Sequence, residues 1–187
     1  MKQENMLPLH PVLLVLFLLF LTATAAVDMS NNLIPKVCDN SSRADPNIRY
    51  TFCTASLQSA PDSPCAALRH LGTISIRLVK FNATNTRCYI RQLLKNTKLT
   101  PYVRQGLNDC DELYSDALST VRKAAKAYGA KNYADANIHL SSVSDAPLTC
   151  EQGFTERKGV KSPLTKRNDQ LFQLSAIALS MINMMVH

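Results

Sequence analysis

Residues 100–129 read TPYVRQGLNDCDELYSDALSTVRKAAKAYG and show the helical period of this chain most clearly. The Thr100 hydroxyl can cap a helix, and Pro101 suits the first helical position, whose amide has no partner inside the helix. Apolar and small residues then recur in steps of four and three: Val103, Leu107, Cys110, Tyr114, Ala117, Val121, Ala124 and Tyr128. This seam predicts a helix packed in a left-handed bundle, with Gly129 as its C-cap.

Two more hydroxyl-proline pairs predict helix starts. The pair at residues 63–64 opens a helix over residues 64–98, and the pair at residues 162–163 opens one that runs nearly to the C-terminus. Residues 132–145 predict a further helix. The apolar stripes of the first and last of these helices are Leu71, Ile74, Leu78, Phe81 and Cys88, and Leu171, Leu174, Ala178, Met181 and Met185. Four long helices with short connections predict an antiparallel up-and-down bundle, and we find no alternating strand pattern.

The last apolar run, LFQLSAIALSMINMMV, has two interpretations. It predicts a core-facing helix, because polar residues interrupt it at Gln173, Ser175, Ser180 and Asn183. The alternative is a lipid-anchor signal, in which case the tail would be removed.

The N-terminus has the pattern of a secretory signal peptide. Residues 1–26 combine a lightly charged start, the apolar run VLLVLFLLFL and the small-residue stretch TATAA, and the run is short for a membrane span. Cleavage after Ala25 or Ala26 leaves residues 27–187 as one secreted domain with no membrane segment. The net charge of the chain is +7, and this removal does not change it.

The cysteines fit an oxidising secretory route. They stand at Cys38, Cys53, Cys65, Cys88, Cys110 and Cys150. Sequence alone leaves fifteen complete pairings open, although Cys65 and Cys88, on one continuous helix, would lie about 35 Å apart and so could not bond. A cysteine left unpaired is expected to be buried and inert. Sequons at Asn40 and Asn82 predict N-glycosylation on the same route.

The polar stretch CDNSSRADPNIRYTFC, from Cys38 to Cys53, overlaps two segments of short-helix length, NLIPKVC and PNIRYTFCTASL. Asp45-Pro46 between them is a helix-start signal. Two short helices bury too little apolar surface to be stable alone. A covalent tie would make them a hairpin that can extend beyond the bundle.

The sequence offers little for catalysis. His70, His139 and His187 are isolated, and the chain has no Cys-x-x-Cys pair, phosphate-cradling glycine loop or nucleophile elbow. We therefore expect a protein that is not an enzyme, with no catalytic residue, metal or cofactor.

A basic stripe is the one polar pattern that stands out. It comprises Arg77, Lys80, Arg87, Arg91, Lys95 and Lys98, and Arg122, Lys123, Lys126 and Lys131 add charge near the end of the next helix. The simpler interpretation is a solvated face, and the alternative is a surface that attracts a polyanion or an acidic protein. Secretion and the absence of interleaved aromatic residues argue against nucleic acid.

Beyond the signal, the chain resembles the plant invertase inhibitor and pectin methylesterase inhibitor family. The resemblance rests on the cysteine order and on PNIRYTFCTASL, LGTISIRL, LNDCDELYSDALSTV, NYADANIHLSSVSDAPLTCEQGF and SPLTKRN. It implies an all-α fold, in which a disulfide-closed helical hairpin (residues 27–60) projects from an antiparallel four-helix bundle (residues 61–187). The disulfides that it implies are Cys38–Cys53 and Cys110–Cys150. Cys65 and Cys88 lie outside this pattern.

The resemblance also implies a protein inhibitor. Some members insert a Pro-Lys-Phe loop into an invertase active site, and the equivalent region here reads Lys131-Asn132-Tyr133, which keeps only an aromatic residue. No contact role is transferred on that basis. Lys131 and Tyr133 remain candidate target contacts because a cation and a ring suit a sugar site lined by carboxylates, and the alternative is that they merely begin a helix.

The resulting hypothesis is a secreted inhibitor of the cell wall or vacuole that occludes the active site of a plant acid invertase, non-covalently and at about one to one. A pectin methylesterase target is the first alternative. The second is a structural or binding protein of the wall, which its +7 charge adsorbs weakly to acidic pectin.

Overall fold

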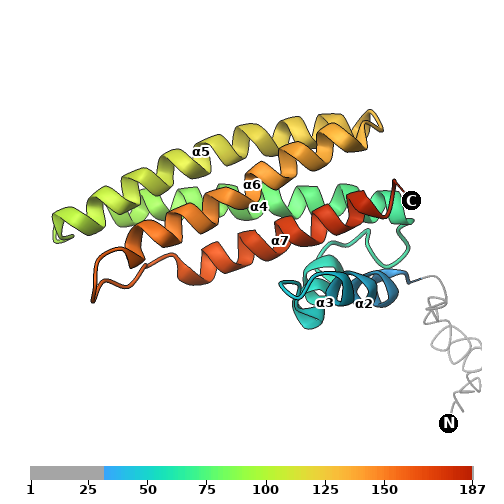
Figure 1. Cartoon of the computed structure of the whole chain (residues 1–187), viewed down its shortest axis with the longest axis horizontal. Helices are drawn as coiled ribbons and strands as arrows, with labels where there is room; N and C mark the ends of the chain where they lie inside the picture. Colours follow the sequence, from blue (N-terminus) through green and yellow to red (C-terminus); the bar gives the residue numbers. More distant parts are fainter. Residues whose placement is uncertain (1–31, 187) are drawn as a thin grey trace, which may run out of the picture. The chain divides into compact units, whose positions relative to one another are not determined.

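The computed structural model describes residues 32–186, so the signal peptide expected at residues 1–26 lies outside the described residues. Within that range every regular element is a helix. The bundle consists of α4 (Leu68–Leu94), α5 (Pro101–Gly129), α6 (Tyr133–Thr155) and α7 (Thr165–Asn183) (Figure 1). Each helix packs against the next, and α4 also packs against α7, so the four close into a ring. The predicted all-α up-and-down bundle is confirmed.

Helix α5 follows its sequence pattern. The Thr100 hydroxyl accepts a hydrogen bond from the Val103 amide at 3.4 Å, and Pro101 is the first helical residue. From Leu107 to Tyr128 every residue of the predicted seam is buried. The seam forms the α5 contribution to a core shared by all four bundle helices.

The other two hydroxyl-proline pairs do not start helices. Residues 63–64 and 162–163 lie in irregular connections and turns, and α4 and α7 each begin after them. The Ser162 hydroxyl accepts a hydrogen bond from the Leu164 amide at 3.1 Å. A serine turn of this kind competes with helix capping, which explains why the helix start predicted at residues 162–163 was wrong. Helix α4 also ends at Leu94, four residues before the predicted end.

Helix α6 extends beyond its predicted end at residue 145, continuing through Pro147 to Thr155. Proline removes the hydrogen bond to the Val143 carbonyl and would ordinarily end or kink the helix. Here Val143, Pro147 and Cys150 are all buried against the bundle, and Cys150 is covalently linked to α5. Tertiary packing therefore outweighs the local preference, and Cys150 lies within the helix.

The predicted stripe on α4 was wrong in its second half, because Phe81 is 65% exposed and Cys88 is also exposed. Leu71 and Ile74 do lie on a buried face, which packs against the N-terminal hairpin. Beyond the hairpin that face meets solvent. The bundle core uses another side of α4, with Val79, Ala83 and Ile90 buried.

The N-terminal hairpin consists of α2 (Ile34–Ala44) and α3 (Tyr50–Gln58). Asp45-Pro46 does not start the second helix, because the Asp45 carboxylate accepts a hydrogen bond from the Asn47 amide at 2.8 Å and closes a turn. Helix α3 begins only after that turn.

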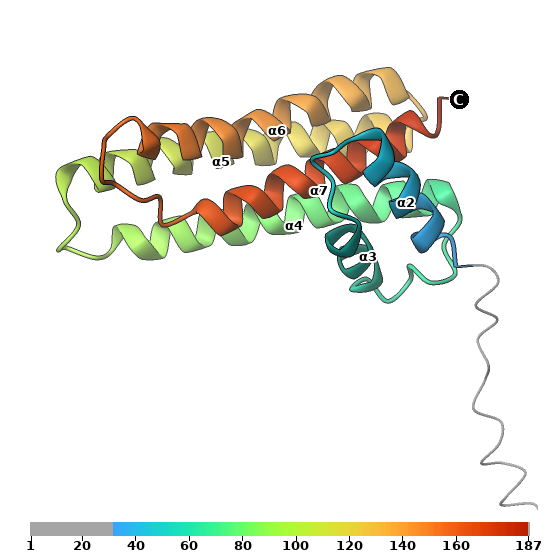
Figure 2. The ribbon, with the colours of Figure 1, turned by 60° about the horizontal axis from the view of Figure 1, so that its bottom comes forward.

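The hairpin does not project from the bundle as the resemblance implied. It lies along α4 and α7 (Figure 2). A second core cluster joins the two parts through Ile34, Val37, Cys38, Ile48, Cys53, Leu57, Ala60, Ala66, Leu71, Ile74, Ala176, Ile177 and Met181. The apolar face of the hairpin would be exposed if it projected, so burial favours the docked arrangement.

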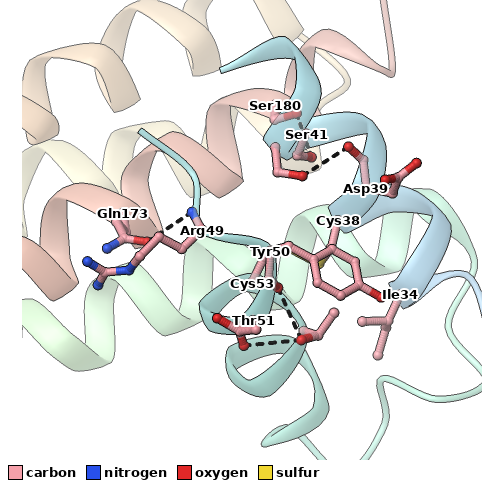
Figure 3. Close-up of a disulfide and its surroundings, with 12 residues drawn as sticks. Ile34, Cys38, Asp39, Ser41, Arg49, Tyr50, Thr51, Cys53, Gln173 and Ser180 are labelled. Atoms are coloured by element: carbon pink, nitrogen blue, oxygen red, sulfur yellow. Dashed lines mark hydrogen bonds between the residues drawn. A yellow bond between two sulfur atoms is a disulfide. The ribbon is translucent and has the colours of Figure 1, made fainter. Parts of the chain in front are cut away.

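Hydrogen bonds add to this docking (Figure 3). The Ser180 hydroxyl of α7 donates to the Ser41 hydroxyl of α2 at 2.8 Å, and the Arg49 amide donates to Gln173 Oε1 at 3.3 Å. The Arg49 guanidinium also pairs with Asp169 at 2.7 Å. Buried Ser41 and Gln173 thus find polar partners, which makes the interface specific.

Two disulfides are formed. Cys38–Cys53 closes the hairpin with a Cα–Cα distance of 5.7 Å, and Cys110–Cys150 links α5 to α6 at 5.1 Å. Both distances are usual for disulfides. The first ties two short helices that could not fold alone, and the second joins the first half of α5 to the last turns of α6.

Cys65 and Cys88 are unpaired, and both are exposed. The expectation of buried thiols was wrong, since Cys65 lies in the loop before α4 and Cys88 on the solvent side of α4. Within residues 32–186, no helix has both the length and the apolar character needed to cross a membrane.

Gly72 lets Tyr128 of α5 approach the backbone of α4, and the Tyr128 hydroxyl donates to the Arg69 carbonyl at 3.0 Å. A Cβ at position 72 would overlap this hydroxyl and the adjacent ring carbon. We expect Gly72→Ala to lower the free energy of unfolding by about 2 kcal/mol, because the core must shift to relieve the overlap. Urea denaturation measures the change.

A matched control is Gly153→Ala, where a new Cβ meets nothing within 4 Å. That substitution is expected to be neutral or slightly stabilising, since alanine favours a helix over glycine. In a Tyr128→Leu background, Gly72→Ala should cost less than about 1 kcal/mol. Equal costs in both backgrounds would show that the overlap is not the cause.

Candidate functional site

The turn between α5 and α6 carries the candidate contacts. The Lys131 amide donates to the Tyr128 carbonyl at 3.0 Å, and the Asn132 amide donates to the Ala127 carbonyl at 2.9 Å. This pair of bonds is a Schellman motif, which needs a left-handed residue after the helix. Lys131 fills that position with φ 62°.

Gly129 is therefore not the C-cap that the sequence predicted. It is the last helical residue, and Ala130 is the cap. Helix α5 runs one residue past the buried Tyr128, and the chain reverses only after it. The left-handed position consequently falls on Lys131, a residue type that occupies it at a cost of about 1–2 kcal/mol.

The residues after Lys131 are held in place by short-range contacts. The Asn132 side chain caps α6 by accepting from the Asp135 amide at 3.2 Å, and its Nδ2 donates to the Asp135 carboxylate at 2.6 Å. The Tyr133 ring packs edge-on against Tyr128 at a centroid distance of 5.3 Å. Lys131 and Tyr133 thus flank one residue on a rigid turn.

A groove of about 710 Å³ lies beside this turn. Its lining residues are Lys131, Asn132, Tyr133, Ala134, Asn137, Ile138, Asn183, Met185 and Val186. Asn137 of α6 donates to Asn183 of α7 at 2.8 Å and holds the two walls together. Ile138 and Val186 are 66% and 62% exposed. Exposed apolar side chains beside a polar rim are typical of protein-binding surfaces.

Lys131 brings a positive charge to this turn. Among residues 32–186, the Lys131 amine has no carboxylate within ion-pair distance. Burial, and to a smaller extent Tyr133, raise the pKa of Tyr128 to about 12, and Arg69 opposes the shift. Tyr128 therefore remains a neutral donor at ordinary pH, and Lys131 supplies a cation that is free to meet an acidic partner.

The basic stripe divides into two parts. Arg87 and Arg91 both pair with Asp111 of α5 at 3.1 Å, so a single carboxylate offsets half of their combined charge. Arg77 lies 3.9 Å from exposed Asp62, a weak contact. The paired part is a structural link between α4 and α5, whereas the part near Arg77 remains available.

The other predicted positions are spread over the molecule. Asn40 is exposed on α2, whereas Asn82 is half-buried within α4, and its Oδ1 is buried without a hydrogen-bond partner. His70 and His139 lie on different helices, and His187 is outside the described residues. In the described part of the chain, no three His, Cys, Asp or Glu side chains group as a metal site would require.

Sequence reasoning named Lys131 and Tyr133 as candidate contacts and missed the rest of the groove. Ile138, Asn183, Met185 and Val186 come from the start of α6 and the end of α7, about 45 residues apart. The one available signal was Ile138, an apolar residue beside polar neighbours. Only the packing of α6 against α7 brings these walls together.

The fold is that of a disulfide-linked helical protein, with an exposed groove beside a hydrogen-bonded turn. A family model described as plant invertase/pectin methylesterase inhibitor matches residues 32–181, and the chain belongs to this family. Its members are inhibitors of enzymes and not enzymes themselves.

The relatives carry both target names. A protein of Platanus orientalis named "Putative invertase inhibitor" is 38% identical over 84% of this chain and 92% of its own length. "Pectinesterase inhibitor 12" of Arabidopsis thaliana is 34% identical over 93% of this chain and 98% of its own. The crystal structure of a mutant form of an Arabidopsis pectin methylesterase inhibitor matches with a TM-score of 0.68 at 19% identity, covering 82% of this chain and 97% of that one. The structural match supports the fold.

Proposed function

We propose that this protein is a secreted inhibitor that occludes the active site of a plant acid invertase, non-covalently and at about one to one. The observation that carries the proposal is the left-handed Lys131 beside Tyr133 on the rigid α5–α6 turn. Invertases are glycosidases, and most glycosidases use a pair of carboxylates. An exposed cation next to a ring complements such a site in charge and shape.

Rigidity supports the same proposal. The Schellman bonds and the Asn132 cap order the turn before binding, so little conformational entropy is lost on docking. The groove beside the turn adds exposed Ile138 and Val186 as apolar contacts. An inhibitor that acts by blocking a cleft needs these features and no catalytic group.

A pectin methylesterase is the second candidate target. It is favoured by the 34% identity to "Pectinesterase inhibitor 12", which this chain matches over nearly its whole length. The Platanus orientalis protein is named an invertase inhibitor and is 38% identical to this chain, against 34% for "Pectinesterase inhibitor 12", which favours invertase. Secretion to the cell wall or vacuole, through the predicted signal at residues 1–26, belongs to either version.

The direct test is to titrate the purified, oxidised protein against an acid invertase and a plant pectin methylesterase. We expect invertase activity to fall to a plateau near one equivalent and to recover on dilution, with the esterase unaffected. Inhibition of the esterase alone would replace the target and keep the class. No inhibition of either enzyme, or turnover of their substrates by the protein itself, would overturn the proposal.

Lys131→Gly separates recognition from folding at the same residue. Glycine adopts positive φ without strain, so the free energy of unfolding should rise by about 1 kcal/mol. Because the cation is lost, the inhibition constant for invertase should increase about tenfold or more. Thermal denaturation and inhibition assays measure the two effects.

Lys131→Arg is the matched control, since it keeps the charge and the backbone cost. It should retain most of the inhibition. If Lys131→Gly were more stable and inhibited as well as the parent, Lys131 would be a helix terminus only and the proposed contact would be wrong.

A further inference from the structure

A second concave site lies between α4 and α5, away from the turn. Its volume is about 180 Å³, and it is lined by Thr73, Ile76, Arg77, Lys80, Val121, Ala125, Tyr128 and Gly129. On the apolar side Ala125 of α5 is exposed, and Ile76 of α4 and Val121 of α5 are almost wholly buried behind it. Neither the invertase nor the esterase version of the proposed function uses this cleft.

The cleft exists because small residues line the α5 side. Ala125 is exposed and Gly129 has no side chain, so nothing on α5 fills the space that Arg77 and Lys80 border on α4. Tyr128 is buried beneath and is held by its bond to the Arg69 carbonyl. The cleft is thus part of the packing of two rigid helices and needs no rearrangement to open.

The charges at the rim are available to a ligand. In the part of the chain that the structure describes, the Lys80 amine has no carboxylate within ion-pair distance, and Arg77 has only the 3.9 Å contact with exposed Asp62. Further along α4, Arg87 and Arg91 share Asp111. Lys80 and Arg77 are therefore available at the rim of the cleft, whereas Arg87 and Arg91 are already paired with a carboxylate.

The dimensions restrict the ligand. A volume of 180 Å³ is about six times the share of one water molecule in the liquid, and it is below the ~300 Å³ at which pockets for drug-sized molecules begin. One sugar ring fits, with its apolar face on Ala125. Thr73 supplies a hydroxyl at the edge, and two cations would pair with a carboxylate on the ring.

We propose that the α4–α5 cleft binds a uronate residue of an acidic oligosaccharide, with the sugar ring on Ala125 and the carboxylate paired with Arg77 and Lys80. The rest of the sugar chain would continue in solvent along the basic stripe of α4. This makes the basic stripe a carbohydrate site at one defined position and not a uniformly attractive face.

The test uses trigalacturonate as the probe and isothermal titration calorimetry as the readout, at low and moderate salt. Arg77→Gln with Lys80→Gln should weaken binding about fivefold or more, as expected for the loss of two exposed charge contacts. The matched control, Lys95→Gln with Lys98→Gln, removes the same charge from exposed positions of the same stripe. It should change affinity less than about twofold.

A third variant keeps every charge. Ala125→Met fills the cleft from the exposed side of α5. It should also weaken binding about fivefold, because the longer side chain occupies the space of the sugar ring. Circular dichroism confirms that each variant is folded. Fully methyl-esterified trigalacturonate should bind more weakly than the acid, and polyglutamate should not compete at equal charge concentration.

Several outcomes would overturn the proposal: no measurable binding by the parent, equal losses in the two double variants, or no effect of Ala125→Met. Competition by polyglutamate would show that charge alone is recognised. The cleft variants should still inhibit the target enzyme. If the parent protein binds trigalacturonate as expected but inhibits neither enzyme, only the proposed function is refuted. If it inhibits its target but does not bind trigalacturonate, only the cleft proposal is refuted.

Discussion

Cys110→Ser combined with Cys150→Ser is expected to lower the free energy of unfolding by about 4 kcal/mol. The two cysteines are 40 residues apart in sequence, so the bond closes a long loop in the unfolded chain. Both are almost fully buried, and they join α5 to α6, the most extensively packed pair of helices. Since domains are usually stable by only about 5–15 kcal/mol, this loss would be a large share of the total.

Guanidinium denaturation of the oxidised parent and the double variant measures this change. The matched control is Cys65→Ser with Cys88→Ser, which alters two exposed, unpaired cysteines. Its effect should stay within about 0.5 kcal/mol, as for other surface substitutions. A loss below about 1 kcal/mol for the disulfide variant would mean that helix packing alone restricts the chain.

Asn168→Leu is expected to cost about 3 kcal/mol, because it breaks a hydrogen-bond network that connects three helices. The Tyr114 hydroxyl of α5 donates to Asn168 Oδ1 at 2.7 Å, and Asn168 Nδ2 donates to the Glu151 carboxylate of α6 at 2.7 Å. The Thr165 hydroxyl donates to the other carboxylate oxygen at 2.5 Å. Leucine would leave the buried Tyr114 hydroxyl without its acceptor and would remove the hydrogen bond from Asn168 to the charged Glu151 carboxylate.

The burial of Tyr114 makes this loss large. Its side chain is inaccessible to solvent, and burial raises the pKa of its hydroxyl, so it remains a neutral donor that needs an acceptor. Adding Tyr114→Phe to Asn168→Leu should recover part of the stability, since neither polar group then remains buried without a partner. Urea denaturation of the single and double variants gives the coupling energy.

The control for the asparagine is Asn137→Leu, which removes the exposed amide contact to Asn183 between α6 and α7. It should cost less than about 0.5 kcal/mol, because water replaces the lost partner. If Asn168→Leu cost no more than Asn137→Leu, the network would contribute nothing beyond packing.

The candidate site was predictable only in part. Lys131 and Tyr133 could be named from the family resemblance, which places residues 131–133 at the Pro-Lys-Phe loop, and because a cation and a ring suit a sugar site lined by carboxylates. The left-handed conformation of Lys131 could not, since Gly129 two residues earlier is the better local candidate. The groove walls and the α4–α5 cleft depend on which helices are neighbours.

The linear pattern was sufficient for whatever depends on near neighbours in the chain: the seam and N-cap of α5, the presence of four long helices, and two short helical segments before them. Folding in three dimensions settled which face of each helix is covered. It exposes Phe81, continues α6 through Pro147, and docks the hairpin on α4 and α7. The physical reason is that periodicity records a repeating apolar face, whereas burial depends on which partner covers that face and where the partner ends.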